Sequence, residues 1–172
     1  MLPAGSLPQC ILAWRDFSRR QVTDTVDRQT RSRMMAGIRG KDTRPELALR
    51  RALHRLGFRF RLHAKGLAGR PDILLPRYGA AVFVHGCFWH RHRGCRFATV
   101  PASRPDFWKG KFEGNTERDI RNRAALLDLG WRIAVVWECT LKEPAKIAET
   151  AAILADWLRT DVNQIEIGTN SR

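Results

Sequence analysis

The chain lacks a hydrophobic run long enough to cross a membrane. None of its apolar stretches approaches the roughly 20 residues that a bilayer-spanning helix requires. The pattern of a secretory signal is also absent, because Arg15, Asp16, Arg19 and Arg20 follow the short apolar patch at 11–14 and no small-residue cleavage site is evident. We therefore expect a cytoplasmic protein with no membrane partner.

Acidic residues are scarce beside basic ones. The 172 residues include 31 Lys and Arg but only 17 Asp and Glu, which gives a formal net charge of +14. Thirteen basic and two acidic residues lie between Arg28 and Arg70, whereas the segment from Glu113 to the end has eight basic and ten acidic residues. Such an uneven distribution favours a face that binds a polyanion over a generally solvated basic surface.

The length limits the number of domains. A chain of 172 residues can bury one sizeable core and is too short for two ordinary domains. Residues 1–27 show no sustained periodicity and are expected to form a loosely ordered extension. The domain itself is expected at 28–160, followed by a C-terminal tail at 161–172.

Helical and strand patterns alternate along this domain. Thr43 and Glu46 form a capping box that predicts the start of a helix, and Gly57 predicts its end. The long helix is expected to bury Ile120, Ala124 and Leu127. Helices are predicted at 31–39, 43–56, 107–129 and 144–158, and strands at 58–63, 71–75, 80–84 and 131–137. This order indicates an α/β fold of three layers, with a mixed sheet between helices.

Cysteine is rare, and its distribution is informative. Two of the four cysteines and three of the five histidines fall within residues 85–95, directly after an apolar strand pattern. Histidine and thiolate are the usual zinc ligands, and a structural site needs four of them. Cys139 could supply one from across the sheet, whereas Cys10 lies alone in the extension. The alternative is that the thiols are small buried hydrophobes and the histidines face solvent.

A single carboxylate stands out at the beginning of a predicted strand. Asp72 ends the run Gly-Arg-Pro-Asp at 69–72 and precedes Ile-Leu-Leu. A hard anionic oxygen in this place suits a magnesium-dependent phosphodiesterase. A Pro-Asp pair is more often only a turn, so the interpretation depends on the histidine segment that follows the neighbouring strand.

Aromatic side chains occur beside cations. Phe88 and Trp89 lie in the histidine-rich segment, and Phe107 and Trp108 follow Arg104. Exposed aromatic rings next to basic residues can stack on bases or wedge between base pairs. We expect Trp89 and Trp108 to act in this way and Phe107 to belong to the core.

Taken together, the motifs resemble those of the very-short-patch-repair mismatch endonucleases, the Vsr family. The resemblance runs in order from about Asp27 to Leu141, and the run Gly-Cys-Phe-Trp-His at 86–90 is its most specific part. The matching motifs are Thr30-Arg31-Ser32, Gly69 to Asp72, His85 to His90, Phe107-Trp108, Asn115 to Asp119, Gly130 to Arg132 and Trp137 to Cys139. The resemblance implies a restriction-endonuclease-like fold, catalytic magnesium and a structural zinc.

The resemblance also implies a role for each group of residues. Asp72 and the main-chain carbonyl of Val84 would bind magnesium. The acid-base or water-positioning groups would be His85 and His90, supported by Glu46 and Asp119. The zinc ligands would be Cys87, His92, Cys95 and Cys139. The DNA contacts would be made by the intercalating Phe88, Trp89 and Trp108 and by Arg31, Arg33, Met35, Arg70, Lys111 and Asn115.

Several positions depart from the family pattern or allow a second interpretation. Val84 replaces a threonine, which a main-chain ligand tolerates. The longer spacing from His92 to Cys95 leaves His90 as an alternative zinc ligand, and Glu46 could serve only as a helix cap. The usual acidic-x-lysine pair of this fold is missing. Histidine, with a pKa near neutrality, would therefore act as the general base or orient the attacking water.

The implied function is recognition of the T·G mismatch left by deamination of 5-methylcytosine, with a nick 5′ of the thymine. The partners would be mismatched double-stranded DNA and, functionally, other mismatch-repair proteins and a cytosine-5 methyltransferase. We expect a monomer in the bacterial cytoplasm, associated with the nucleoid through DNA. A restriction-type nuclease and a non-catalytic zinc-stabilised DNA-binding protein are the alternatives. The aromatic wedge argues against the first, and Asp72 with His85 against the second.

Overall fold

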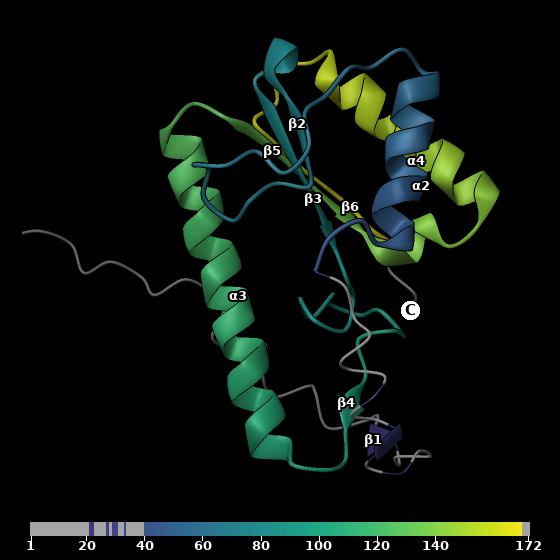
Figure 1. Cartoon of the computed structure of the whole chain (residues 1–172), viewed down its shortest axis with the longest axis vertical. Helices are drawn as coiled ribbons and strands as arrows, with labels where there is room; N and C mark the ends of the chain where they lie inside the picture. The colour runs from purple at the N-terminus through teal and green to yellow at the C-terminus, as the bar shows by residue number, and fades with distance from the viewer. Residues whose placement is uncertain (1–20, 23–26, 28, 31–32, 34–39, 170–172) are drawn as a thin grey trace, which may run out of the picture.

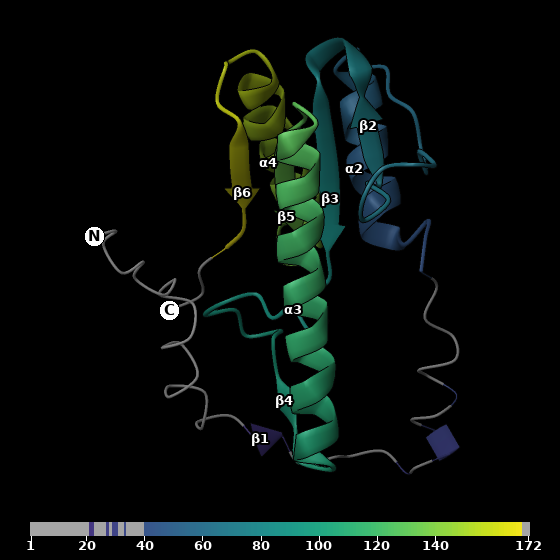
Figure 2. The ribbon, with the colours of Figure 1, turned by 90° about the vertical axis from the view of Figure 1, so that its left-hand side faces the viewer.

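The computed structural model describes residues 21–22, 27, 29–30, 33 and 40–169. Its elements are β1 (Gln21–Val22), α2 (Arg44–Arg55), β2 (Ile73–Leu75), η2 (Pro76–Tyr78), β3 (Ala80–His85), β4 (Val100–Pro101), α3 (Pro105–Asp128), β5 (Arg132–Trp137), η3 (Glu138–Leu141), α4 (Pro144–Leu158) and β6 (Gln164–Ile167). A four-stranded sheet has the order β2-β3-β5-β6, with α3 on one face and α2 and α4 on the other (Figure 1 and Figure 2). The predicted mixed α/β arrangement, a sheet flanked by helices, is confirmed.

The sheet brings the ends of two central strands together. β2 pairs with β3 in the antiparallel sense, whereas β3, β5 and β6 run parallel. β5 therefore has a partner on each side, which explains its nearly continuous apolar sequence. In the β3–β5 register His85 lies opposite Trp137, so the segments that follow both strands leave the sheet at the same edge.

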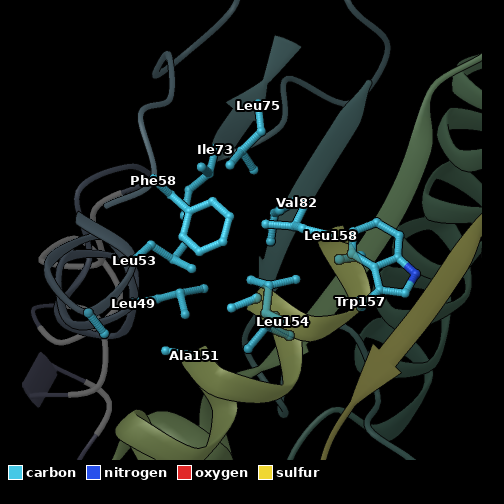
Figure 3. Packing of buried hydrophobic residues seen from close by; sticks show 14 of the residues in the cluster. Leu49, Leu53, Phe58, Ile73, Leu75, Val82, Ala151, Leu154, Trp157 and Leu158 are labelled. Atoms are coloured by element: carbon cyan, nitrogen blue, oxygen red, sulfur yellow. The ribbon is translucent and has the colours of Figure 1, made fainter. Parts of the chain in front are cut away.

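Apolar packing fixes α2 and α4 on the sheet. Leu49 and Leu53, one turn apart on α2, are fully buried against Leu154 of α4 and Val82 of β3 (Figure 3). Each such side chain contributes about 1.5–3 kcal/mol on burial. This core holds the N-terminal end of α2 beside the edge of the sheet where β3 ends.

The start and end of α2 agree with the predicted capping box and stop. Thr43 is the N-cap, and its hydroxyl oxygen accepts a hydrogen bond from the backbone N–H of Glu46 at 3.5 Å. The Glu46 carboxylate reaches back and accepts from the backbone N–H of Asp42 at 2.9 Å. Gly57 follows the helix with φ of +87°, a left-handed conformation that glycine adopts without strain.

Several predictions of secondary structure or burial are wrong. Residues 58–63 form no strand, apart from an isolated bridge at Arg61, because Phe58 turns into the core against Tyr78 and His63 has a positive φ of 51°. Ile120 and Ala124 of α3 are exposed, because the helix turns a different face, with Trp108, Phe112 and Leu126, toward the protein. The segment assigned to a tail contains β6, the fourth strand of the sheet.

The N-terminal region is described only in part. Gln21 and Val22 of β1 pair in parallel with β4 at Val100 and Pro101. The predicted helix at 31–39 lies almost entirely outside the described residues, as do Cys10, Arg31 and Met35. Arg33 is described, is helical and is exposed. In the part of the chain that the structure describes, no helix has the length and apolar character needed to span a bilayer.

Candidate active site and metal centre

A cleft of about 1250 Å³ opens at the edge of the sheet where β3 ends, between the start of α2 and the inward face of α3. All six residues proposed for magnesium binding or catalysis line this cleft, although they come from distant parts of the sequence. They are Glu46, Asp72, Val84, His85, His90 and Asp119. Side chains from distant parts of the sequence often meet at a functional site, and here the complete fold is needed to bring them together.

Asp72 is a partly desolvated carboxylate in the cleft. Its Oδ2 accepts a hydrogen bond from the backbone N–H of Val84 at 2.7 Å, and its own N–H donates to the carbonyl of Val82 at 3.0 Å. Burial raises the pKa of Asp72 to about 6, and the nearby charge of Glu46 also raises it, against the opposing effect of the Val84 hydrogen bond. A carboxylate in this state fits a site that a divalent cation completes.

His85 and His90 form a stacked pair beside Asp72's strand. Their ring centroids are 3.9 Å apart with an interplanar angle of 12°. His90 Nδ1 lies 2.5 Å from Asp119 Oδ2, so the carboxylate of α3 fixes the orientation of this ring. Burial, reinforced by the neighbouring charge of His90, lowers the pKa of His85 to about 3, which keeps His85 neutral at physiological pH.

Asp119 stays ionised in this arrangement. Burial by itself would raise the pKa of Asp119, but the hydrogen bond and the charge of His90 outweigh it, and the pKa is lowered. The ring nitrogens of His85 and His90 and a carboxylate oxygen of Asp119 lie within 4.8 Å of one another. The group can therefore orient and exchange protons, and its geometry would also admit a cation.

Glu46 is heavily engaged in local hydrogen bonds. Its Oε1 accepts from the Thr43 hydroxyl at 2.7 Å, and its Oε2 accepts from Asp42 N–H and from Arg50 Nη2 at 2.8 Å. The helix-cap interpretation accounts for these contacts. The sequence analysis overlooked Arg50, although its position four residues after Glu46 on a helix is the spacing of an ion pair.

A second cluster lies in the protein interior, away from the cleft. Cys87, His92, Cys95 and Cys139 are all buried, and one ligand atom from each lies within 4.8 Å of the others. His92 Nδ1 is 3.5 Å from the sulfur atoms of both Cys87 and Cys139. Three thiols and one imidazole are the donor set of a tetrahedral structural zinc site, so the cluster could hold such a metal. His90 belongs to the other cluster.

Residues near the C-terminus support this metal cluster. The His92 ring stacks on Trp137 with centroids 4.2 Å apart, and the Trp137 indole N–H donates to Glu166 of β6 at 2.7 Å. A methyl group at Gly168 would lie 2.6 Å from His92 Nε2, so only glycine fits there without displacement. No local pattern pointed to Glu166 or Gly168, since both fall in the segment assigned to a tail.

The aromatic residues of the cleft pack against one another. Phe88 meets Trp89, Trp108 and Phe112 edge-on, with ring centroids 5.0, 5.4 and 5.2 Å away. The expected burial of Phe107 and Trp108 is reversed: Trp108 is 7% exposed and Phe107 is 50% exposed. The reason is that Trp108 belongs to the inward face of α3, whereas Phe107 lines the open part of the cleft with Arg104 over its ring.

Polar and basic side chains complete the cleft. Arg70, Lys111 and Asn115 line it, as the sequence analysis expected of DNA-binding residues, and Arg118 and Arg123 of α3 also do so. The Asn115 amide donates to the carbonyl of Trp89 at 3.0 Å and its oxygen accepts from Arg118. Helix α3 therefore positions the aromatic segment as well as the cationic wall.

A basic cleft with a desolvated carboxylate and a paired-histidine group has the charge and the chemical groups of a site that acts on nucleic acid. The sequence model of the family described as "DNA mismatch endonuclease Vsr" matches residues 23–96. The DNA mismatch endonuclease Vsr of Escherichia coli strain K12 is 39% identical over 150 residues, covering 86% of this chain and 96% of that protein. The chain belongs to the Vsr family of DNA mismatch endonucleases.

Other relatives carry related names. A protein of Xanthomonas oryzae named type II nicking enzyme V.XorIIP is 51% identical over 122 residues, covering 71% of this chain and 89% of the relative. A Neisseria meningitidis protein named type II nicking enzyme V.NmeAIP is 44% identical over 124 residues, covering 72% and 88%. The chain is accordingly a Vsr-type endonuclease, a hydrolase that cleaves DNA.

Proposed function

We propose that this endonuclease recognises T·G mismatches, which arise by deamination of 5-methylcytosine, and nicks the strand 5′ of the thymine to start very short patch repair. The observation that carries the proposal is the position of Trp89 and Trp108, which line the same cleft as Asp72 and His85. Aromatic rings that could respond to the stability of a base pair would thus lie next to the candidate cleavage site.

The physical argument concerns the opening of a base step. Insertion of an aromatic ring costs a few kcal/mol in an intact duplex and less where pairing is faulty. A T·G wobble pair lowers this cost, and phosphate-binding arginines alone cannot select a site. Phe88, Trp89 and Trp108 would therefore provide the selection, after some rearrangement of Trp108, which is buried in the absence of DNA.

Asp72 and the main-chain carbonyl of Val84 would hold Mg²⁺, which supplies electrostatic stabilisation to the phosphate and to the leaving oxygen. His85, neutral because of its burial, would position the attacking water through a ring nitrogen, because a pKa of about 3 makes it a weak base and not the near-neutral histidine that the sequence led us to expect. His90 is held through Nδ1 by Asp119, which leaves its Nε2 to bind water or a phosphate oxygen. Glu46 would support the magnesium site through Arg50, which also contacts the main-chain carbonyl of Asp72.

Zn²⁺ is the metal we propose for Cys87, His92, Cys95 and Cys139, because three thiolates and an imidazole match its preferences. Its role would be structural. Cys139→Ala should lower zinc content and melting temperature, whereas Cys10→Ala should change neither. A protein that carries no zinc and melts at the same temperature with and without chelator would contradict this assignment.

The proposal extends to the fold type, the domain bounds and the partners. A restriction-endonuclease-like fold is consistent with the antiparallel β2–β3 pair next to the parallel β3–β5 pair. We propose one catalytic domain at 28–160, to which β6 adds a strand, after an extension at 1–27. The enzyme would act as a monomer on duplex DNA in the bacterial cytoplasm, alongside mismatch-repair proteins and a cytosine-5 methyltransferase.

The test is nicking of strand-labelled duplexes that carry T·G, T·A or C·G at one position in varied flanking sequences. We expect cleavage on the thymine strand of the T·G duplexes, much faster than on matched DNA. Trp89→Ala should lose this preference more than it loses DNA affinity, with Leu129→Ala, an exposed apolar residue that does not line the cleft, as the control. Equal cleavage of matched and mismatched duplexes in every context would leave a nuclease of another kind.

A further inference from the structure

Arg123 is a cation on the inward face of α3. Phe112, Asn115, Asp119, Arg123 and Leu126 follow one another at intervals of three or four residues, the spacing that puts side chains on one face of a helix. The first two and the last are buried, whereas Asp119 and Arg123 are half-buried and line the cleft. A positive charge is thus carried on a helix face that otherwise points into the protein.

The part of α3 that carries Arg123 lies against the segment that leads to Asp72. A methyl group at Gly69 would lie 2.9 Å from Nδ2 of Asn122, the residue directly before Arg123. The helix covers one face of the sheet and extends past the end of β3 (Figure 1 and Figure 2). Arg123 is therefore held at the point where the helix wall of the cleft meets the wall that presents Asp72.

Arg123 has no partner among the described residues. Its position four residues after Asp119 is the spacing of an ion pair, but the Asp119 carboxylate is paired with His90. The guanidinium makes no hydrogen bond, ion pair or ring contact with another described residue. Burial is the largest influence on the pKa of His85 and of Asp119, and among the smaller influences the charge of Arg123 lowers both. The unpaired cation is therefore close to the paired histidines.

A half-buried cation without a counter-charge is unfavourable unless a ligand supplies one. The substrate of an endonuclease supplies such an anion, because each phosphodiester group carries a negative charge on its two non-bridging oxygens. A guanidinium is planar, stays protonated at any physiological pH and can donate to both of these oxygens at once.

The reaction itself increases the need for a cation at this place. Water adds to the phosphorus atom, one phosphorus–oxygen ester bond breaks, and the departing oxygen takes up a proton. Negative charge grows on the phosphate oxygens as the water adds. A fixed cation at these oxygens therefore binds the transition state more strongly than the uncleaved DNA, which accelerates the reaction.

We propose that Arg123 is a catalytic residue that binds the non-bridging oxygens of the phosphate to be cleaved. Arg118 also lines the cleft, but it donates to Asn115 and so supports the aromatic segment. The inference rests on the proposed cleavage site at Asp72 and His85. It gives α3 a direct contact with the reacting phosphate.

The experiment measures which phosphate Arg123 contacts. The cut is first mapped in whichever duplex the wild type nicks fastest, and duplexes are then made with one neutral methylphosphonate at successive positions of the cleaved strand. For each position, the affinity for plain DNA is divided by the affinity for modified DNA, without added magnesium. Effects of the modification on other groups cancel when this ratio is compared between wild type and variant.

The variants are Arg123→Met and the matched control Arg121→Met, which changes an exposed arginine of the same helix that does not line the cleft. At the cut phosphate, we expect the ratio to be roughly tenfold lower in Arg123→Met than in wild type, because a charged hydrogen bond has already been lost. The control should keep the wild-type ratio at every position.

Rate and stability give two further readouts. Single-turnover nicking by Arg123→Met should be about a hundredfold slower than wild type, with Arg123→Lys between the two. The melting temperature of DNA-free Arg123→Met should equal or exceed that of wild type, because the guanidinium has no described partner to lose. A slower rate in a protein of undiminished stability assigns the residue to the reaction rather than to folding.

Three results would overturn the proposal. They are an unchanged affinity ratio in Arg123→Met, a larger change at a phosphate other than the cut one, and a melting temperature well below that of wild type. The cut is mapped on any duplex that is nicked, so the result does not depend on the T·G mismatch. Loss of the proposed T·G preference would therefore leave the role of Arg123 intact, and an unchanged ratio would leave the proposed substrate intact.

Discussion

Replacement of Asp72 by asparagine should stabilise the metal-free protein while abolishing its nicking activity. The folded protein raises the pKa of Asp72 from the ordinary value of 3.8 to about 6, chiefly through burial. Each pKa unit corresponds to about 1.4 kcal/mol, so the ionised carboxylate costs the folded state up to about 3 kcal/mol at high pH. Asparagine has a similar shape, carries no charge and can still accept the hydrogen bond from Val84.

The dependence on pH has a definite sign. Because the folded pKa lies above the unfolded one, the favourable contribution of protonated Asp72 is fully present below pH 3.8 and is lost as the pH rises through about 6. The stability difference between Asp72→Asn and wild type should therefore be small near pH 4 and approach about 3 kcal/mol at pH 8. Acid should likewise reduce nicking below about pH 6, where the metal ligand becomes protonated.

The assay is urea unfolding of zinc-loaded protein without magnesium, from pH 4 to pH 8. Asp128→Asn is the control, because Asp128 is an exposed carboxylate at the end of α3. Added Mg²⁺ should stabilise wild type and leave Asp72→Asn unchanged, since only the charged ligand binds the ion. A variant that is less stable than wild type at pH 8, or a difference that does not grow with pH, would refute the desolvated-carboxylate argument.

Two further changes test other parts of the site. Gly168→Ala should reduce zinc retention and melting temperature, because the new methyl group would lie 2.6 Å from the ring of the histidine ligand, and Gly110→Ala, at an open helical position, should do neither. Asp119→Asn should lower the nicking rate by about a hundredfold with little loss of DNA affinity, because His90 loses the anion that orients its ring. Unaltered zinc content in the first variant or an unaltered rate in the second would contradict these assignments.

Short sequence motifs singled out several residues that the structure brings close together. Asp72 and His85 stand at the beginning and end of adjacent strands, and the pairing of those strands follows from the turn between them. Cys87 and Cys95 lie close in sequence, and Cys139 follows the strand next to β3. In each case a local pattern, combined with the geometry of neighbouring strands, limits the distance between the side chains.

The errors arose where burial depends on partners far away in sequence. The inward face of α3 combines apolar residues such as Trp108 with the polar Asn115, which lines the cleft, and this interruption led the apolar periodicity to predict the wrong face. β6 consists of alternating polar and apolar residues at the edge of the sheet, a weak signal in a short segment. Arg50 was overlooked because a charged residue on a helix is normally exposed, whereas this one is buried and paired with two carboxylates, those of Asp42 and Glu46.

The short segment 90–92 contributes one histidine to the cleft and one to the buried Cys/His cluster. His90 and His92 are separated by Arg91, which has a positive φ of 56°, and the two rings belong to different clusters. This conformation costs an ordinary residue about 1–2 kcal/mol. The guanidinium of Arg91 offsets the cost by donating to the carbonyls of Ala98 and Thr99 at 3.0 and 2.9 Å. A metal bound at His92 would therefore also fix the direction of His90, so loss of that metal should impair catalysis without any change to the cleft residues themselves.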